Sequence, residues 1–126
     1  MMNNSYVGKI YNTEEIERVL KDRLPEWTYS DEFLKRVFKT SGWRVSLMVT
    51  NAVGHLSEVA WHHPKIIISY NEVEILLNTH DAEGITDRDF ALAEKIEEFV
   101  DWSPDESGHD LLPGLPENSD FTYIRR

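Results

Sequence analysis

The stretch of sequence that decides the fold runs from Trp43 to His80 and reads WRVSLMVTNAVGHLSEVAWHHPKIIISYNEVEILLNTH. In its first half, apolar residues recur at steps of three and one, which is the period of a helix that buries one face. Pro64 cannot continue that helix, so we expect it to span residues 43–60, with Ser41 or Thr40 as its N-cap. The residues assigned to the buried face are Val45, Met48, Val49, Ala52, Val53, Leu56, Val59 and Ala60.

The second half of the stretch predicts a β-hairpin. Two β-prone segments, residues 65–70 and 73–80, are separated by Asn71 and Glu72, which suit a turn. Side chains alternate between the two faces of a strand, so Val73, Ile75, Leu77 and Thr79 should share one face. The hairpin should also return its last residue, His80, toward the end of the preceding helix.

Outward from this stretch, the N-terminal part predicts one helix and two strands. Thr13 is a plausible N-cap for a helix over residues 14–24, and Pro25 ends it. Residues 27–29 and 32–39 then read as two strands.

A last helix is predicted after Thr86, which can act as its N-cap, with Asp89 three residues later completing a capping box. The element order is therefore α-β-β-α-β-β-α. This order predicts an α+β two-layer sandwich, in which a four-stranded antiparallel sheet carries the helices on one face. The residues assigned to the buried stripe of the last helix are Leu92, Ala93, Ile96, Phe99 and Val100.

Composition excludes several classes of protein. The chain has 126 residues, no cysteine and a formal net charge of −10. It cannot form a disulfide scaffold or a cysteine-ligated metal site, and its acidity argues against direct nucleic-acid binding. The longest apolar run, residues 66–68, is far shorter than a membrane span, and residues 1–6 lack the pattern of a secretion signal. We therefore expect a cytoplasmic globular protein that does not enter membranes.

Charge and proline divide the chain into two parts. Residues 101–126 hold six acids, two bases and three of the five prolines, and they show no lasting helical or strand period. They also carry Trp102, Leu111 and Ile124, which a disordered tail would have in smaller number. We expect a folded domain over residues 1–100 and an acidic extension over residues 101–126 that docks on the domain or on a partner subunit.

Three histidines point to proton transfer. His62 and His63 follow the long helix, and the predicted hairpin brings His80 near them. Histidine exchanges its proton near neutral pH, so such a cluster suits acid–base catalysis. Glu58, one helical turn before His62, could orient a ring or raise its basicity.

Structural explanations for the same residues remain open. A histidine pair before a proline can serve only to cap the carbonyls at a helix end, and Asp89 can be only a capping acid. A zinc site is a further alternative, although adjacent histidines point apart and a full ligand set is missing. We expect no metal.

The same residues resemble the signature of the pterin-4a-carbinolamine dehydratases. The family pattern is an acid, three residues, His-His-Pro, an aromatic residue, a third histidine and an aspartate. It is met here by Glu58, the run 62–64, Tyr70, His80 and Asp89. The segments 69–73 and 84–89 also resemble the hairpin and the last helix start of the family, and the likeness covers roughly residues 24–100.

The resemblance implies an enzyme, a hydro-lyase. Such proteins remove water from 4a-hydroxytetrahydropterin, formed when an aromatic amino-acid hydroxylase uses tetrahydropterin, and give quinonoid dihydropterin without a cofactor. By position, His62, His63 and His80 are the expected catalytic residues. His63 would protonate the leaving hydroxyl, His80 would support proton transfer, and His62 would position the pterin. Glu58 and Asp89 would contact the pterin or hold the histidines.

Two positions depart from the family pattern. Trp61 stands where a small polar residue is usual, and Ile66 stands where tryptophan is frequent. Trp61 could form an aromatic wall for the pterin, or it could pack on a neighbouring subunit or on the tail.

The resemblance also implies a homodimer or homotetramer, with Leu47 and nearby His55 as candidate contacts. The alternative function is a protein-binding module of the same fold, an assembly factor or a dimerisation cofactor, which would not need the histidines.

Overall fold

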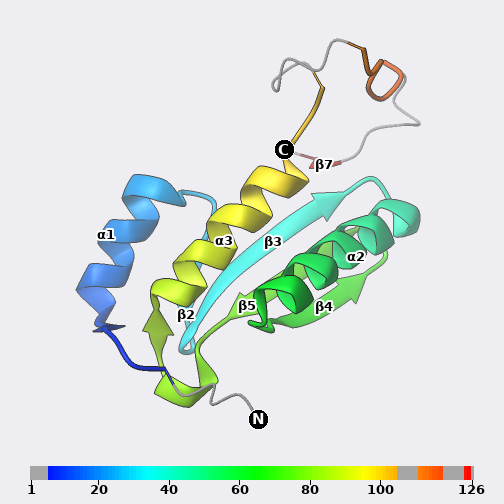
Figure 1. Ribbon diagram of the computed structural model, residues 1–126. Helices are drawn as coiled ribbons and strands as arrows, with labels where there is room; N and C mark the ends of the chain where they lie inside the picture. Colours follow the sequence, from blue (N-terminus) through cyan, green and yellow to red (C-terminus); the bar gives the residue numbers. More distant parts are fainter. Residues whose placement is uncertain (1–5, 105–110, 118–123, 126) are drawn as a thin grey trace.

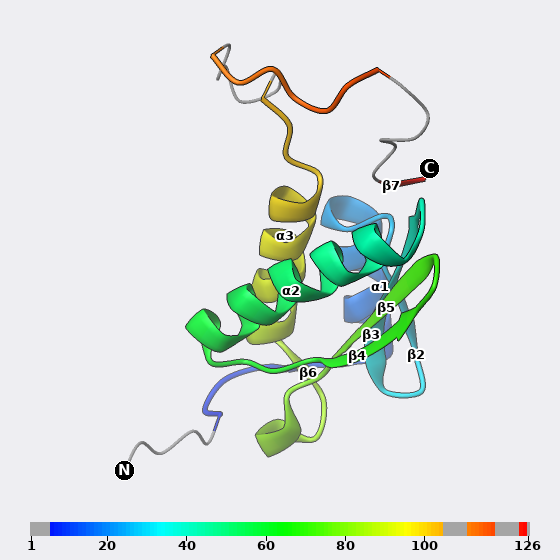
Figure 2. The ribbon, with the colours of Figure 1, turned by 90° about the vertical axis from the view of Figure 1, so that its right-hand side faces the viewer.

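The computed structural model describes residues 6–104, 111–117, 124 and 125, and it confirms the predicted fold class. Three helices pack against an antiparallel sheet (Figures 1 and 2). The helices are α1 (Thr13–Arg23), α2 (Trp43–Ala60) and α3 (Asp87–Val100). The strands of the main sheet are β2 (Thr28–Ser30), β3 (Phe33–Thr40), β4 (Lys65–Ser69) and β5 (Glu72–Leu77). None of the helices in the described part of the chain is both long and apolar enough to cross a membrane.

The main sheet has the strand order β2-β3-β5-β4, and each neighbouring pair is antiparallel. The register places Phe38 of β3 opposite Val73 of β5, and Leu34 opposite Leu77. All four side chains are buried, because alternate residues of both strands face the helices. The predicted inner face of the second hairpin strand, from Val73 to Thr79, is therefore confirmed.

The N-caps of two helices differ from the predicted ones, and the N-cap of the third is as predicted. Asn12, not Thr13, caps α1, and it forms a capping box with Glu15. Gly42 precedes α2 without any side-chain cap, so the predicted roles of Ser41 and Thr40 were wrong. Thr86 and Asp89 form the predicted capping box of α3.

The buried face of α2 is narrower than predicted. Val45, Val49 and Val53 are buried, whereas Met48 and Val59 are exposed by 44% and 74%. The sheet and α3 cover only part of the helix surface, and apolar residues at the edges of the stripe stay in contact with water. A similar correction applies to Phe99 of α3, which is 51% exposed.

Two serines, Ser46 and Ser57, are buried on the inner face of α2, and a search for apolar residues does not find them. The Ser57 hydroxyl donates a hydrogen bond to the Val53 carbonyl at 2.7 Å. The Ser46 hydroxyl lies 2.7 Å from the Thr40 hydroxyl and donates to the Tyr70 carbonyl at 3.1 Å. Their burial is tolerated because each hydroxyl has a partner within the protein.

Three short strands add to the predicted architecture. β1 (Ile10–Tyr11) pairs with β6 (Ile85–Thr86) and ties the N-terminal segment to the start of α3. β7 (Ile124–Arg125) pairs with Lys39 and Thr40 of β3, and Ile124 packs against the core. The tail thus contacts the domain at this point, one of the two predicted docking places, while residues 105–110, 118–123 and 126 lie outside the described part.

Candidate active site

The end of α2 sets the direction of the two adjacent histidines. Trp61 adopts the left-handed conformation (φ 54°, ψ 47°), and its N–H bonds to the Glu58 carbonyl. The His62 N–H bonds to the Ser57 carbonyl at 3.1 Å. This pair of bonds is the Schellman motif, which ends the helix and turns the chain sharply. Glycine is the usual residue at the left-handed position, because a side chain there is strained.

His62 is held by the buried carboxylate of Asp89. Its Nε2 lies 2.6 Å from Asp89 Oδ1, and the two side chains are 12% and 0% exposed. The other oxygen, Oδ2, accepts bonds from the Thr79 hydroxyl at 2.8 Å and the Thr86 N–H at 2.9 Å. An ionised carboxylate only accepts hydrogen bonds, so the His62 tautomer that satisfies this contact with ionised Asp89 is the one with its proton on Nε2.

His63 sits in a more open environment. Its Nε2 lies 2.8 Å from Glu58 Oε1, and both side chains are at least half exposed. The Trp61 ring meets the His63 ring edge-on, with 4.8 Å between the ring centroids. His63 therefore has an acidic partner on one side and an aromatic partner on the other, and it remains accessible to solvent.

His80 was predicted to end a strand, and this prediction was wrong. β5 stops at Leu77, and His80 begins a short 3-10 helix, η1 (His80–Ala82). The bridge between Thr79 and Gly84 holds the base of this loop. Because Thr79 also bonds to Asp89, the loop that carries His80 is anchored to the same carboxylate that holds His62.

The three histidines line one pocket of about 210 Å³. Trp61 lines it too, while Glu58 and Asp89 reach it through their bonds to His63 and His62. Four further residues line the pocket that were not predicted as site residues: Asn78, Thr79, Asp81 and Arg88. Thr79 could have been noticed as a polar residue that ends an apolar strand face. Within the described residues, no group of three or more His, Asp or Glu side chains is arranged to hold a metal ion.

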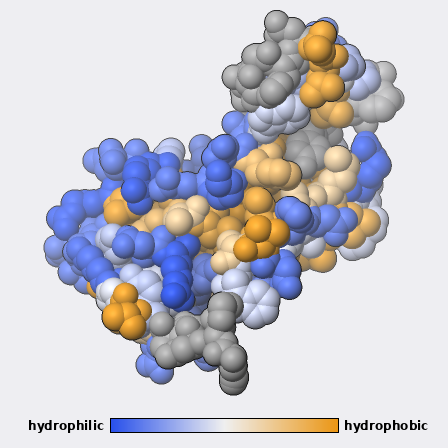
Figure 3. Space-filling view, viewed as in Figure 1, coloured by the Kyte–Doolittle hydropathy of each residue, from blue (hydrophilic) through white to orange (hydrophobic). Residues whose placement is uncertain are grey.

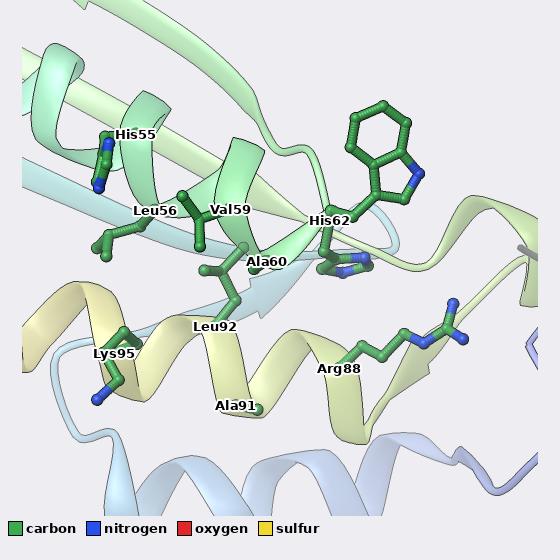
Figure 4. A pocket seen from close by; sticks show the side chains of 10 residues that line it. His55, Leu56, Val59, Ala60, His62, Arg88, Ala91, Leu92 and Lys95 are labelled. Atoms are coloured by element: carbon green, nitrogen blue, oxygen red, sulfur yellow. The ribbon is translucent and has the colours of Figure 1, made fainter. Parts of the chain in front are cut away.

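A second and larger hollow adjoins this pocket. It lies between α2 and α3, has a volume of about 660 Å³, and shares Trp61, His62 and Arg88 with the histidine pocket (Figure 4). His55, which the sequence analysis named only as a possible subunit contact, lines its far end.

Comparisons with known proteins identify the family of this chain. Residues 9–99 match the family model described as "Pterin 4 alpha carbinolamine dehydratase". Two relatives carry the name "Putative pterin-4-alpha-carbinolamine dehydratase". The one from Aquifex aeolicus is 39% identical over 87 residues, which are 69% of this chain and 87% of the relative. The one from Haloarcula marismortui is 46% identical over 78 residues, 61% of this chain and 85% of the relative.

A solved structure shows the same fold. The crystal structure of a transcriptional coactivator/pterin dehydratase from Brucella melitensis aligns with a TM-score of 0.65 and 25% sequence identity. The alignment covers 71% of this chain and 96% of that one. The family model, the relatives and the fold lead to one conclusion: this chain belongs to the pterin-4a-carbinolamine dehydratase family.

Proposed function

We propose that the protein dehydrates 4a-hydroxytetrahydropterin to quinonoid dihydropterin, in the recycling of tetrahydropterin after an aromatic amino-acid hydroxylase has used it. The observation that carries this proposal is the convergence of His62, His63 and His80 on one pocket. The reaction breaks the C4a–O bond, loses the N5 proton and forms a C4a=N5 double bond. It therefore needs an acid at the leaving hydroxyl and a base at N5, each worth roughly 10²–10⁴-fold in rate.

The environments of the histidines suggest different roles. His63 is accessible and bonded to an exposed carboxylate, so it suits protonation of the hydroxyl, which leaves as water. His80 lies on the neighbouring loop and suits a supporting role in proton transfer. The proton of His62 Nε2 is engaged by Asp89, so His62 suits positioning of the pterin ring.

Trp61 supports the pterin as an aromatic wall in this proposal. It lines the pocket, is 52% exposed and holds a strained backbone conformation, a combination typical of functional positions. Pterin titration with tryptophan fluorescence, in the parent and in Trp61→Phe, tests this role. Equal quenching in the two proteins would exclude the stacking contact.

The central experiment follows the absorbance change as freshly generated 4a-hydroxytetrahydropterin loses water. We expect the protein to exceed the uncatalysed rate, and His63→Ala to lose about 10²-fold or more with its fold intact by circular dichroism. Asn51→Ala, at an exposed position of α2 outside the pocket, should leave the rate unchanged. A folded parent protein with no rate above background would refute the proposal.

The second candidate function is protein binding, alone or in addition to catalysis. Leu47 and Met48 of α2 are 40% and 44% exposed, which gives the helix an apolar surface suited to another subunit or another protein. We propose a homodimer or homotetramer. Light scattering of the parent and of Leu47→Lys measures this: a smaller mass for the variant supports the contact, and a monomeric parent excludes the oligomer.

A further inference from the structure

The larger hollow is a groove with an apolar centre and polar ends. Leu56, Val59 and Ala60 line it from α2, and Ala91 and Leu92 line it from α3. Figure 4 shows these side chains between His62 and Arg88 at one end and His55 and Lys95 at the other. In the space-filling view, hydrophobic surface gathers between α3 and α2 (Figure 3).

The groove continues from the histidine pocket. Trp61, His62 and Arg88 line both spaces, so the groove lies directly beside the pocket and an extended molecule could contact both. The pocket itself measures about 210 Å³, below the roughly 300–1,000 Å³ of common ligand sites. A pterin ring that fills the pocket would leave the substituent at its C6 carbon to lie elsewhere.

The ionisable side chains that line the groove differ in kind from those of the chain as a whole. The chain carries 23 acids against 13 lysines and arginines, yet the ionisable residues that line the groove are all basic. At the far end, Lys95 Nζ lies 3.1 Å from Glu98 Oε2, an exposed pair that a ligand carboxylate could replace at little cost. Lys95 is therefore the group at that end that can pair with an anionic ligand.

The length of the groove sets the size of the ligand. His55 and Ala60, the last residue of α2, are five residues apart, and Arg88 and Lys95 are seven apart on α3. At 1.5 Å per residue, these spacings correspond to about 7.5 to 10.5 Å. One aromatic ring with a short linker and a terminal carboxylate spans such a distance.

We infer that the groove binds the C6 substituent of the pterin substrate, and that the preferred substrates carry an aromatic ring ending in a carboxylate. The inference rests on the proposed function, because the histidine pocket must hold the pterin ring. The apolar centre contacts the aromatic ring, and Lys95, across the same end of the groove from His55, binds the carboxylate.

The test compares two stable oxidised pterins by calorimetric titration of the full chain. Pteroic acid carries the aromatic carboxylate, and 6-methylpterin carries only a methyl group. We expect pteroic acid to bind at least tenfold more tightly. Ala91→Trp fills the groove from an exposed position and should remove this preference, with 6-methylpterin binding unchanged. Lys95→Gln should reduce it several-fold, whereas Lys21→Gln and Glu17→Trp on α1 should preserve it.

The outcomes separate this inference from the proposed function. Equal affinities in the parent, or equal weakening of both ligands by Ala91→Trp, would overturn the inference. If 6-methylpterin binds and the dehydration assay succeeds, the proposed function then still stands. Failure of both ligands to bind, together with a failed dehydration assay, would overturn both. If the oligomer of Ala91→Trp has a different mass in solution while the ligand preference is unchanged, the groove binds a second copy of the chain. That result would refute the inference.

Discussion

The imidazole of His62 and the carboxylate of Asp89 are 27 residues apart in sequence and meet at 2.6 Å, with Asp89 fully buried. The contact joins the chain just beyond α2 to the first turn of α3. Because Asp89 also accepts bonds from Thr79 and Thr86, one carboxylate fixes a histidine, a helix start and the base of the His80 loop together.

Asp89→Asn should therefore reduce both stability and activity. The amide replaces one of the two acceptor oxygens by a donor, so either the His62 ring changes tautomer and loses its charge-assisted contact, or one of the three present bonds is lost. We expect the free energy of unfolding to fall by about 1–3 kcal/mol, measured in urea, and the dehydration rate to fall with it. Asp87→Asn, on the same helical turn but exposed, serves as the matched control. An Asp89 variant as stable as the parent would contradict this account.

Glu58→Gln tests the role of the exposed partner of His63. Glutamine keeps the length and an acceptor oxygen but removes the charge, so we expect a several-fold lower dehydration rate. Stability should change by less than about 1 kcal/mol, because exposed pairs contribute little. Steady-state kinetics and urea unfolding measure the two effects. An unchanged rate would show that His63 works without its acidic partner.

Trp61→Asn should raise the stability of the protein and weaken its binding of pterin. Asparagine tolerates the left-handed conformation that Trp61 holds, so relief of strain should raise the free energy of unfolding by about 1 kcal/mol. Loss of the ring should weaken pterin binding, measured by calorimetry. A less stable variant would show that the contact of Trp61 with His63 outweighs the backbone strain.

Glu15 gives a pH-dependent prediction at the start of α1. The backbone hydrogen bond from Asn12, together with Lys9, lowers the pKa of Glu15 below its ordinary value of 4.5. The ionised form is favoured in the folded state, so its contribution is present above pH 4.5 and is lost as pH falls through the lowered pKa. The stability difference between the parent and Glu15→Gln should shrink below pH 4.5. A difference independent of pH would contradict the prediction.

Removal of residues 101–126 tests the expected division of the chain. Truncation removes the β7 pairing with β3 and the packing of Ile124, so we expect a modest loss of stability. The histidine pocket is lined from residues 61–88, so the dehydration rate per folded site should persist. Light scattering on the same sample reports any change of oligomer. Loss of activity without unfolding would place the extension in the site.

The sequence determined the architecture, because periodicity is local. Steps of three and one marked α2, alternation marked β5, and Thr86 with Asp89 marked the start of α3. The His-His pair, His80 and their acidic neighbours were also readable, since their spacing carries the family resemblance. What periodicity could not show was how much of each helix would be covered, so Met48, Val59 and Phe99 were assigned to the interior.

Only the tertiary structure decided how these residues meet. Asp89 is a capping acid in the sequence, but the packing of α3 beside the end of α2 also makes it the partner of His62. The same packing places Arg88 in the pocket and opens the groove toward Lys95. Such contacts depend on the distances between elements that lie far apart in the chain. Burial then strengthens the hydrogen bonds that are shielded from water. A sequence pattern shows only which residues are available to form them.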